Sequence, residues 1–168
     1  MLQKDYPDVF VKDVSIASAF GIFPNMIWNG GGFFCGPQYD FGAVKETYDF
    51  YRFYSIPIKL TLTNPVLDEI DCLDKYCNAI LTISSDYSDI VEALVSSPIL
   101  ENHIRTFFPD IVLNHSIIAT KEDKNVNAYI EECQKYKDIV LPRRVIKNES
   151  FLKSSPVELR NRCEILCT

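Results

Sequence analysis

The chain has 168 residues, a mass of 19.3 kDa, a formal net charge of −6 and an isoelectric point of about 4.9. Hydrophobic residues make up 47% and charged residues 24%, which is typical of globular proteins and excludes disordered, collagen-like and coiled-coil compositions. The acidic balance disfavours DNA and other nucleic acids as sequence-independent partners, because such binding needs a basic surface.

The first twenty residues contain no basic segment followed by an apolar run of signal-peptide length. No stretch approaches the ~18 consecutive apolar residues of a membrane span. The cysteines form no CxxC pair, and we expect reduced thiols. They are Cys35, Cys72, Cys77, Cys133, Cys163 and Cys167. The sequence therefore predicts a cytoplasmic protein without a membrane partner.

Short apolar segments alternate along the chain with amphipathic ones, which gives roughly six strands and five helices by periodicity, in addition to short strand-like segments at residues 26–29 and 92–95. Strand-like segments are, in chain order, residues 14–20, 26–29, 56–63, 78–83, 92–95, 110–118, 138–145 and 164–167. Helical stripes cover residues 40–55, 66–77, 98–108, 126–136 and 151–163. In the fourth helical stripe, we expect Glu131 and Glu132 to be solvated charges.

The strand at residues 56–63 alternates cleanly between two faces. Its aliphatic side chains point one way, and Lys59, Thr61 and Thr63 point the other way. If the aliphatic face meets helices, the polar face lines the interior of a barrel. Lys59 lies near the start of the strand, where barrels hold residues for stability, so we expect a structural role. The alternative is a buried lysine that acts as a base.

Alternating strands and helices predict an α/β fold, with parallel strand pairing and helices that cover the sheet. A complete eight-stranded barrel usually needs about 200 residues or more. We therefore expect a single α/β domain over residues 1–168 with a partial or minimal TIM-barrel-like fold, the N-terminal part of a longer barrel. An open, doubly wound parallel sheet is the alternative.

Three stretches have the order and pattern of the collagenase-like peptidase family, which includes tRNA and rRNA hydroxylation proteins. They are residues 25–36 (NMIWNGGGFFCG), residues 40–64, and residues 140–144 (VLPRR) with the helix and strand that follow. The resemblance implies a TIM-barrel-like N-terminal region of an RNA- or small-anion-modifying enzyme. The chain departs from the family at Arg144, where the family has glutamate, and after His115, where it lacks the family's glutamine.

The hydroxylation-type relatives hold an iron-sulfur cluster with four cysteines, most of them beyond the region that resembles this chain. Cys163 and Cys167 alone cannot supply four thiolates. We therefore expect no cofactor in this chain, and an iron-sulfur cluster only with additional cysteines beyond Thr168.

Ligand sites of barrels lie at the carboxyl ends of strands, so we expect a pocket among the residues that follow the predicted strands. The candidate pocket consists of Trp28, Asn29, Gly30, Gly31, Asn64, His115 and Arg143. Glycines after a strand let backbone N–H groups approach a ligand. His115 can act as a base or ligand. Arg143, which we prefer over Arg144, can clamp a carboxylate or phosphate.

Each of these residues also has a structural interpretation. The glycines suit a tight turn, Asn64 before Pro65 suits a helix N-cap, and Arg143 suits an ion pair. No nucleophile–base pair or metal-ligand spacing is visible, so no catalytic residue is assigned.

We expect a domain that binds a small anionic molecule or RNA and that lacks a complete catalytic site. The alternative is a non-enzymatic binding or assembly module that uses an open sheet edge. Its partner would be a second copy of the chain or a missing C-terminal half.

Overall fold

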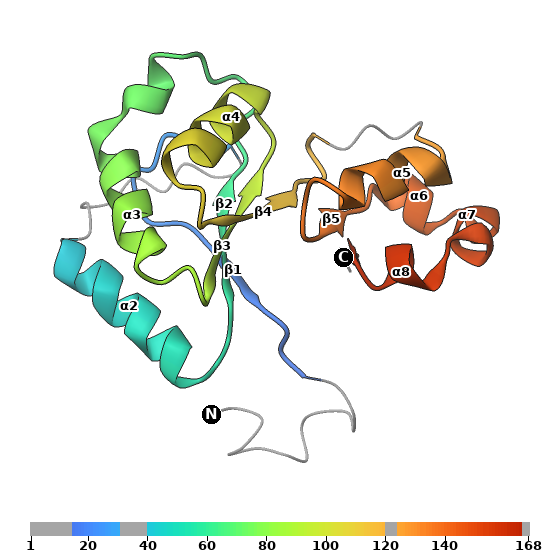
Figure 1. Ribbon diagram of the computed structural model, residues 1–168, viewed down its shortest axis with the longest axis horizontal. Helices are drawn as coiled ribbons and strands as arrows, with labels where there is room; N and C mark the ends of the chain where they lie inside the picture. The colour runs from blue at the N-terminus through green and yellow to red at the C-terminus, as the bar shows by residue number, and fades with distance from the viewer. Residues whose placement is uncertain (1–14, 31–39, 120–123, 166–168) are drawn as a thin grey trace.

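The computed structural model describes residues 15–30, 40–119 and 124–165. Within them, six strands form one parallel sheet in the order β1-β2-β3-β4-β5-β6, so each strand pairs with its neighbours along the chain. They are β1 (Ala19–Gly21), β2 (Ile58–Leu62), β3 (Val91–Val95), β4 (Val112–His115), β5 (Ile139–Val140) and β6 (Cys163–Glu164). The sheet curls into a half-barrel, which confirms the predicted α/β, partial TIM-barrel-like class (Figure 1).

Helices connect the strands and leave the concave side of the sheet uncovered. They are α2 (Phe41–Phe53), the 3-10 helix η2 (Asp71–Leu73), α3 (Lys75–Ser85), α4 (Pro98–Phe107), α5 (Val126–Cys133), α6 (Arg143–Ile146), α7 (Glu149–Ser154) and α8 (Val157–Arg160). Side-chain oxygens of Asp40, Asp74, Ser97, Asn125 and Asn148 accept N–H bonds at the starts of five of them. In Figure 1, α2, α3 and α4 gather beside β1 to β4, while α5 to α8 lie together beyond β5.

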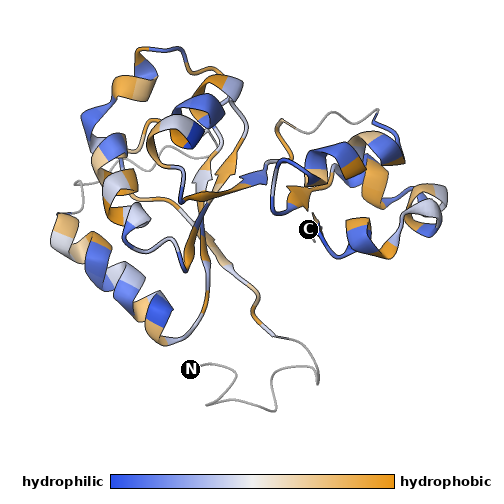
Figure 2. Cartoon of the chain, viewed as in Figure 1, coloured by the Kyte–Doolittle hydropathy of each residue, from blue (hydrophilic) through white to orange (hydrophobic). Residues whose placement is uncertain are grey.

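Two hydrophobic clusters hold these layers together. The larger cluster packs Leu60, Ala93 and Leu113 of the sheet against α2, α3 and α4. The smaller cluster joins α5 to α8 with β5, through residues that include Tyr129 and Ile139. Figure 2 shows helices that carry hydrophobic and hydrophilic residues on different sides, as this packing requires. That residues 1–168 form a single domain stays a prediction.

Five predicted elements are wrong, one of which is the helix at residues 151–163, because the chain there is divided into α7 and α8. Residues 26–29 form turns, and no continuous helix covers residues 66–77. Residues 78–83, predicted as a strand, lie inside α3, because Asp74 caps that helix and a short apolar run does not distinguish strand from helix. The strand predicted at residues 138–145 is only β5, because Pro142 ends it and begins α6.

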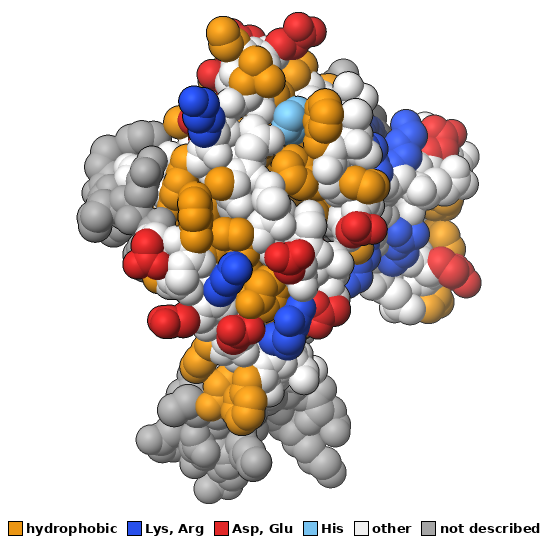
Figure 3. All heavy atoms as spheres, turned by 60° about the vertical axis from the view of Figure 1, so that its left-hand side comes forward, with side chains coloured by type: hydrophobic (Ala, Val, Ile, Leu, Met, Phe, Trp, Pro, Cys, Tyr) orange, Lys and Arg blue, Asp and Glu red, His pale blue; other side chains and the backbone are white. Residues whose placement is uncertain are grey.

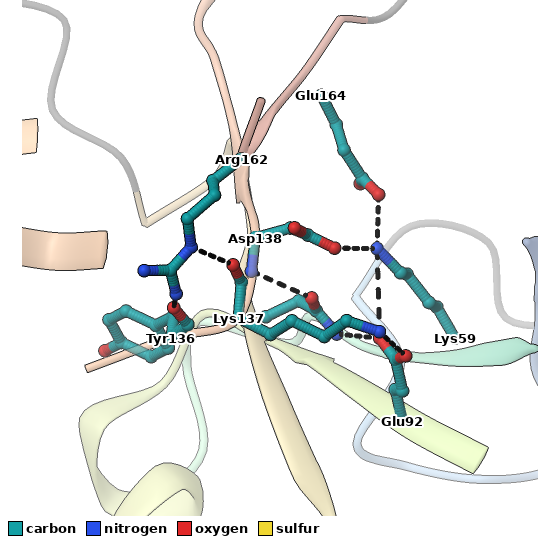
Figure 4. A network of polar contacts seen from close by, with 8 residues as sticks. Lys59, Glu92, Tyr136, Lys137, Asp138, Arg162 and Glu164 are labelled. Atoms are coloured by element: carbon teal, nitrogen blue, oxygen red, sulfur yellow. Dashed lines mark hydrogen bonds and ion pairs between the residues drawn. The ribbon is translucent and has the colours of Figure 1, made fainter. Parts of the chain in front are cut away.

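A buried ion-pair network crosses the concave side of the sheet (Figure 4). Lys59 of β2 is 3% exposed, and its Nζ donates to Asp138 Oδ2 at 2.8 Å and to Glu164 of β6. Glu92 Oε2 of β3 lies 3.9 Å from the same ammonium. Lys59 therefore faces the interior, as predicted, and ties the second strand of the sheet to the sixth.

A second layer of contacts keeps the carboxylates in place. Glu92 Oε2 accepts a hydrogen bond from Asn114 Nδ2 at 2.8 Å, and Glu92 also pairs with Lys137. The backbone N–H of Asp138 donates to Asn114 Oδ1 at 3.1 Å. Burial lowers the pKa of Lys59, but the hydrogen bonds and negative charges of Asp138 and Glu164 outweigh it and raise that pKa above its usual value. Lys59 is therefore a charged structural residue rather than a base at neutral pH.

Replacing Lys59→Met should lower the free energy of unfolding by about 2–4 kcal/mol, because it leaves the partly buried carboxylates of Asp138 and Glu164 without their cation. Urea denaturation followed by the fluorescence of Trp28, the single tryptophan of the chain, measures this. The control is Lys153→Met on α7, whose exposed pair with Glu149 should contribute less than about 1 kcal/mol. Equal losses in the two variants would contradict the structural role of Lys59.

Candidate functional site: the His115 cavity

A cavity of about 250 Å³ lies between α4 and α5, at the carboxyl ends of β3 and β4. It is lined by Val95, Ser96, Pro98, Glu101, His115, Ala119, Lys124, Glu132 and Tyr136, and we call it the His115 cavity. Leu113 belongs to the helix-side core, and residues two apart on a strand share a face. His115 therefore points to the helix side of β4, away from the Lys59 network.

Three buried polar atoms of the His115 cavity have no hydrogen-bond partner: Ser96 Oγ, His115 Nδ1 and Glu132 Oε2. His115 Nδ1 lies 3.4 Å from the other carboxylate oxygen, Glu132 Oε1, which pairs with Lys124. Buried polar groups in proteins are nearly always hydrogen-bonded. Three unpartnered atoms around one small cavity therefore indicate a place for a polar occupant.

The imidazole of His115 is held by its neighbours. It stacks on the ring of Tyr136 with centroids 4.5 Å apart and an interplanar angle of 4°. The Tyr136 hydroxyl donates to Glu101 Oε2 at 2.5 Å, and Arg105 Nε donates to Glu101 Oε1 at 2.9 Å. The histidine is thus positioned by a chain of contacts that reaches the outer side of α4.

Burial, together with the positive charges of Lys124 and Lys135 and against the opposing charge of Glu101, lowers the pKa of His115 to about 4. The imidazole is therefore neutral at pH 7 and carries one donor and one acceptor nitrogen. Together with the carboxylate of Glu132 and the ammonium of Lys124, the cavity can hold hydrogen-bond donors and one negative group. No hydrogen bond joins Ser96 to His115, so the two do not form an activated nucleophile and base.

The structure brings Trp28, Asn29, Gly30 and Asn64 together at the end of β2. The Asn64 N–H donates to Trp28 O at 2.9 Å, and Asn64 Nδ2 donates to Ile27 O at 2.9 Å. Trp28 is fully buried, and its indole N–H donates to Asp71 O at 2.8 Å. These contacts hold the turn before Gly30 against β2, so the role that the structure shows for Trp28 and Asn64 is a structural one. Gly31 lies outside the described residues.

Asn64 does not cap a helix, contrary to one of its predicted interpretations. Its Oδ1 accepts from the Val66 N–H at 3.1 Å, which makes an Asx-turn. Gly30 is required by close approach, because a Cβ there would lie 2.8 Å from the Cα of Asn64. The glycine therefore serves backbone packing at this position.

Arg143 is the first residue of α6 and is exposed. The prediction that it lies on a strand and points into a barrel is wrong, because the chain has already turned at Pro142. Among the predicted site residues that the structure describes, only His115 lines the His115 cavity.

The sequence pattern does not identify five other residues that line the cavity, which are Ser96, Glu101, Lys124, Glu132 and Tyr136. Glu132 was expected to be a solvated helix charge, but its side chain is 13% exposed. The sequence contains one indication that Glu132 is buried. It lies three residues after Tyr129 and four before Tyr136, two tyrosines that are both buried.

The described cysteines do not fit a shared iron-sulfur cluster. Cys72 and Cys77 belong to the larger hydrophobic cluster, whereas Cys133 and Cys163 belong to the smaller one. Burial raises the pKa of the Cys77 thiol to about 12 and that of Cys163 to about 11. Across the described ranges, no group of three or more His, Cys, Asp or Glu side chains is arranged to hold a metal ion.

No helix in the described part of the chain combines the length and apolar character needed to cross a membrane. No protein-family model matches the sequence, and no curated protein matches it. Among solved structures, the U32 peptidase Mk0906 is similar at a TM-score of 0.49 and 17% identity, over 93% of this chain and 69% of that chain. That peptidase is a remote structural neighbour from the collagenase-like family, and the similarity assigns no activity to this chain.

Replacing Gly30→Ala should lower the free energy of unfolding by about 1–3 kcal/mol, because the new methyl group meets the backbone of Asn64. Gly21→Ala is the matched control, since a Cβ at Gly21 meets no atom within 4 Å. Urea denaturation of both variants measures the difference. A Gly30→Ala protein as stable as Gly21→Ala would show that the turn does not need a glycine.

The stability of the protein should fall as the pH drops from 7 towards 4. The folded His115 has a pKa of about 4, below the 6.5 of an unfolded histidine, so the unfolded state binds more protons in this window. The wild type should lose up to about 3 kcal/mol more than His115→Gln over this range. Urea unfolding at a series of pH values tests this, and superimposable losses in the two proteins would refute it.

Proposed function

We propose that this half-barrel domain binds a small polar molecule in the His115 cavity. The observation that carries the proposal is the group of three buried, unpartnered polar atoms of Ser96, His115 and Glu132 around a cavity of about 250 Å³. Leaving such atoms unpaired costs about 1–3 kcal/mol each, and a ligand would recover that energy.

The volume limits the size of the ligand. A water molecule occupies about 30 Å³ of liquid, so the cavity has room for about eight waters. It lies just below the roughly 300–1,000 Å³ typical of sites for drug-sized molecules. A molecule the size of an amino acid fits these limits, whereas a nucleotide does not.

The charges around the cavity indicate the chemistry of the ligand. Glu132 Oε2 accepts hydrogen bonds, which suits an amine or a hydroxyl group. Lys124 supplies the positive charge for an anionic group. The proposed ligand is therefore a small amino acid or hydroxy acid, one form of the small anionic molecule that the sequence pattern suggests.

RNA is a weaker candidate than a small acid at this site. The chain has a net charge of −6, and Glu101 and Glu132 both line the cavity, so the phosphate backbone would meet negative charge. Membership of the collagenase-like peptidase family, and any RNA-modifying activity, rest on the resemblance of the sequence segments. The stretch of residues 140–144 does not support that resemblance, because only Val140 belongs to a strand and Arg143 and Arg144 already begin α6.

Assembly through a sheet edge is the second candidate function. In the described residues, β1 is hydrogen-bonded on one side only, to β2, and its Phe20 is exposed. An edge strand with an exposed aromatic side chain can pair with another chain. Sedimentation equilibrium would support this candidate if the mass rises with protein concentration and if Phe20→Lys abolishes the rise.

The melting temperature should rise when the protein is mixed with the matching member of a panel of amino acids and α-hydroxy acids. A ligand at about 100 times its Kd adds about 2.7 kcal/mol of stability. The variant Glu132→Gln should lose the response, because it removes the carboxylate that receives the donor. Differential scanning fluorimetry measures both proteins.

The matched control is Glu149→Gln, which alters an exposed glutamate on α7 and should keep the full response. The proposal fails if no member of the panel shifts the wild type, or if Glu132→Gln responds as strongly as the wild type does.

A further inference from the structure

A second hollow, larger than the His115 cavity, lies on the outer surface between η2 and α4. It has a volume of about 460 Å³, and we call it the η2–α4 groove. It is lined by Glu69, Cys72, Leu73, Pro98, Ile99, Asn102, His103, Thr106 and Phe107. Figure 3 shows hydrophobic side chains gathered around a histidine on this face of the molecule.

The apolar side chains of this groove are exposed. Leu73 is 70% exposed, Phe107 66% and Ile99 40%, and Val66 and Ile70 on the adjoining turn are exposed as well. Phe107 lies within the helical stripe predicted at residues 98–108 and is nevertheless exposed, and the helix predicted at residues 66–77 is not formed as one element. Single exposed apolar residues are ordinary, but a contiguous group marks an interaction surface.

The groove is already formed and firmly held. Asp68 Oδ1 accepts from the N–H groups of Ile70 at 3.0 Å and Asp71 at 3.2 Å, which fixes the turn before η2. Beneath it, His103 Nε2 lies 2.8 Å from Asn78 Oδ1, and the imidazole packs edge-on against Trp28. A partner would not have to order this surface before binding it.

The rim of the groove is acidic. Residues 66–75 contain Asp68, Glu69, Asp71 and Asp74 against one cation, Lys75. Burial raises the pKa of the Cys72 thiol, and the negative charges of Asp71, Asp68 and Glu69 also raise it. These carboxylates therefore lie close enough to the groove to act on Cys72, one of its lining residues. Such a rim repels nucleic acids and anionic lipids and attracts a cationic partner.

The spacing of the apolar residues suits a helix as the partner. Ile99, His103 and Phe107 are four residues apart and form one ridge along α4, about 12 Å long at 1.5 Å per residue. Leu73 stands on the opposite wall of the groove. Two turns of a helix with apolar residues at every third or fourth position match this length.

We propose that the η2–α4 groove docks a basic amphipathic helix of a partner protein. The apolar stripe of that helix packs between Leu73 and Phe107, and its lysines or arginines face Glu69 and the neighbouring acids. This interaction does not involve the His115 cavity and is independent of the ligand proposed there.

The probe is a fluorescein-labelled peptide of about 18 residues, made of leucine and lysine with leucine at helical spacing. We expect its fluorescence anisotropy to rise with added wild-type protein at about 150 mM salt. Leu73→Asp, Phe107→Asp and Glu69→Lys should each weaken binding at least about tenfold. A peptide with glutamate in place of lysine should bind at least about tenfold more weakly than the lysine peptide.

The matched control is Phe53→Asp, which changes an 80% exposed aromatic residue on α2, outside the groove, and should bind like the wild type. The proposal is overturned if Phe107→Asp binds the lysine peptide as well as the wild type does, or if the glutamate peptide binds equally well. It is also overturned if the groove variants keep normal peptide binding but lose binding to phosphatidylglycerol vesicles. The same holds if they keep normal peptide binding but no longer form a concentration-dependent dimer.

Discussion

The buried ammonium of Lys59 is the constraint on which the shape of this molecule depends. A charge removed from water must be paired, and the hydrogen-bonded partners of Lys59 lie 79 and 105 residues further along the chain. A flat sheet would place β2 and β6 four strand positions apart, about 19 Å, which is too far for these side chains to bridge. The contact between Lys59 and Glu164 therefore requires the sheet to curl, and within the curled sheet Lys59 and Glu92 are buried.

This arrangement divides the sheet into a polar concave side and an apolar side that faces the helices. The apolar side is shared between two hydrophobic clusters, one around α2 to α4 and one around α5 to α8. His115, at the end of β4, lies between α4 and α5. No residue of the smaller cluster lines the His115 cavity, and most of its lining side chains are polar or charged.

The sequence pattern predicted the parallel α/β class and the positions of β2, β3 and α2, because strict alternation and a helical stripe each bury one face. It placed His115 at the end of a strand for the same reason. It failed at residues 78–83 and at Arg143, where a capping aspartate and a proline decided the local structure. It also missed Glu132, whose burial depends on the tyrosines beside it and on the packing of α5 against β4.

The sequence by itself determined the period of β2 and α2, the starts of α4 and α5 and the polar face of β2, because these depend on residues within one or two turns of each other. Tertiary structure alone decided which polar side chains meet, such as Lys59 with Asp138 and Ser96 with Glu132 around their separate sites. It also decided that Leu73 and Phe107 remain exposed. Such contacts join residues far apart in the chain, and their distances are set by the curvature of the sheet and by the packing of the helices on it.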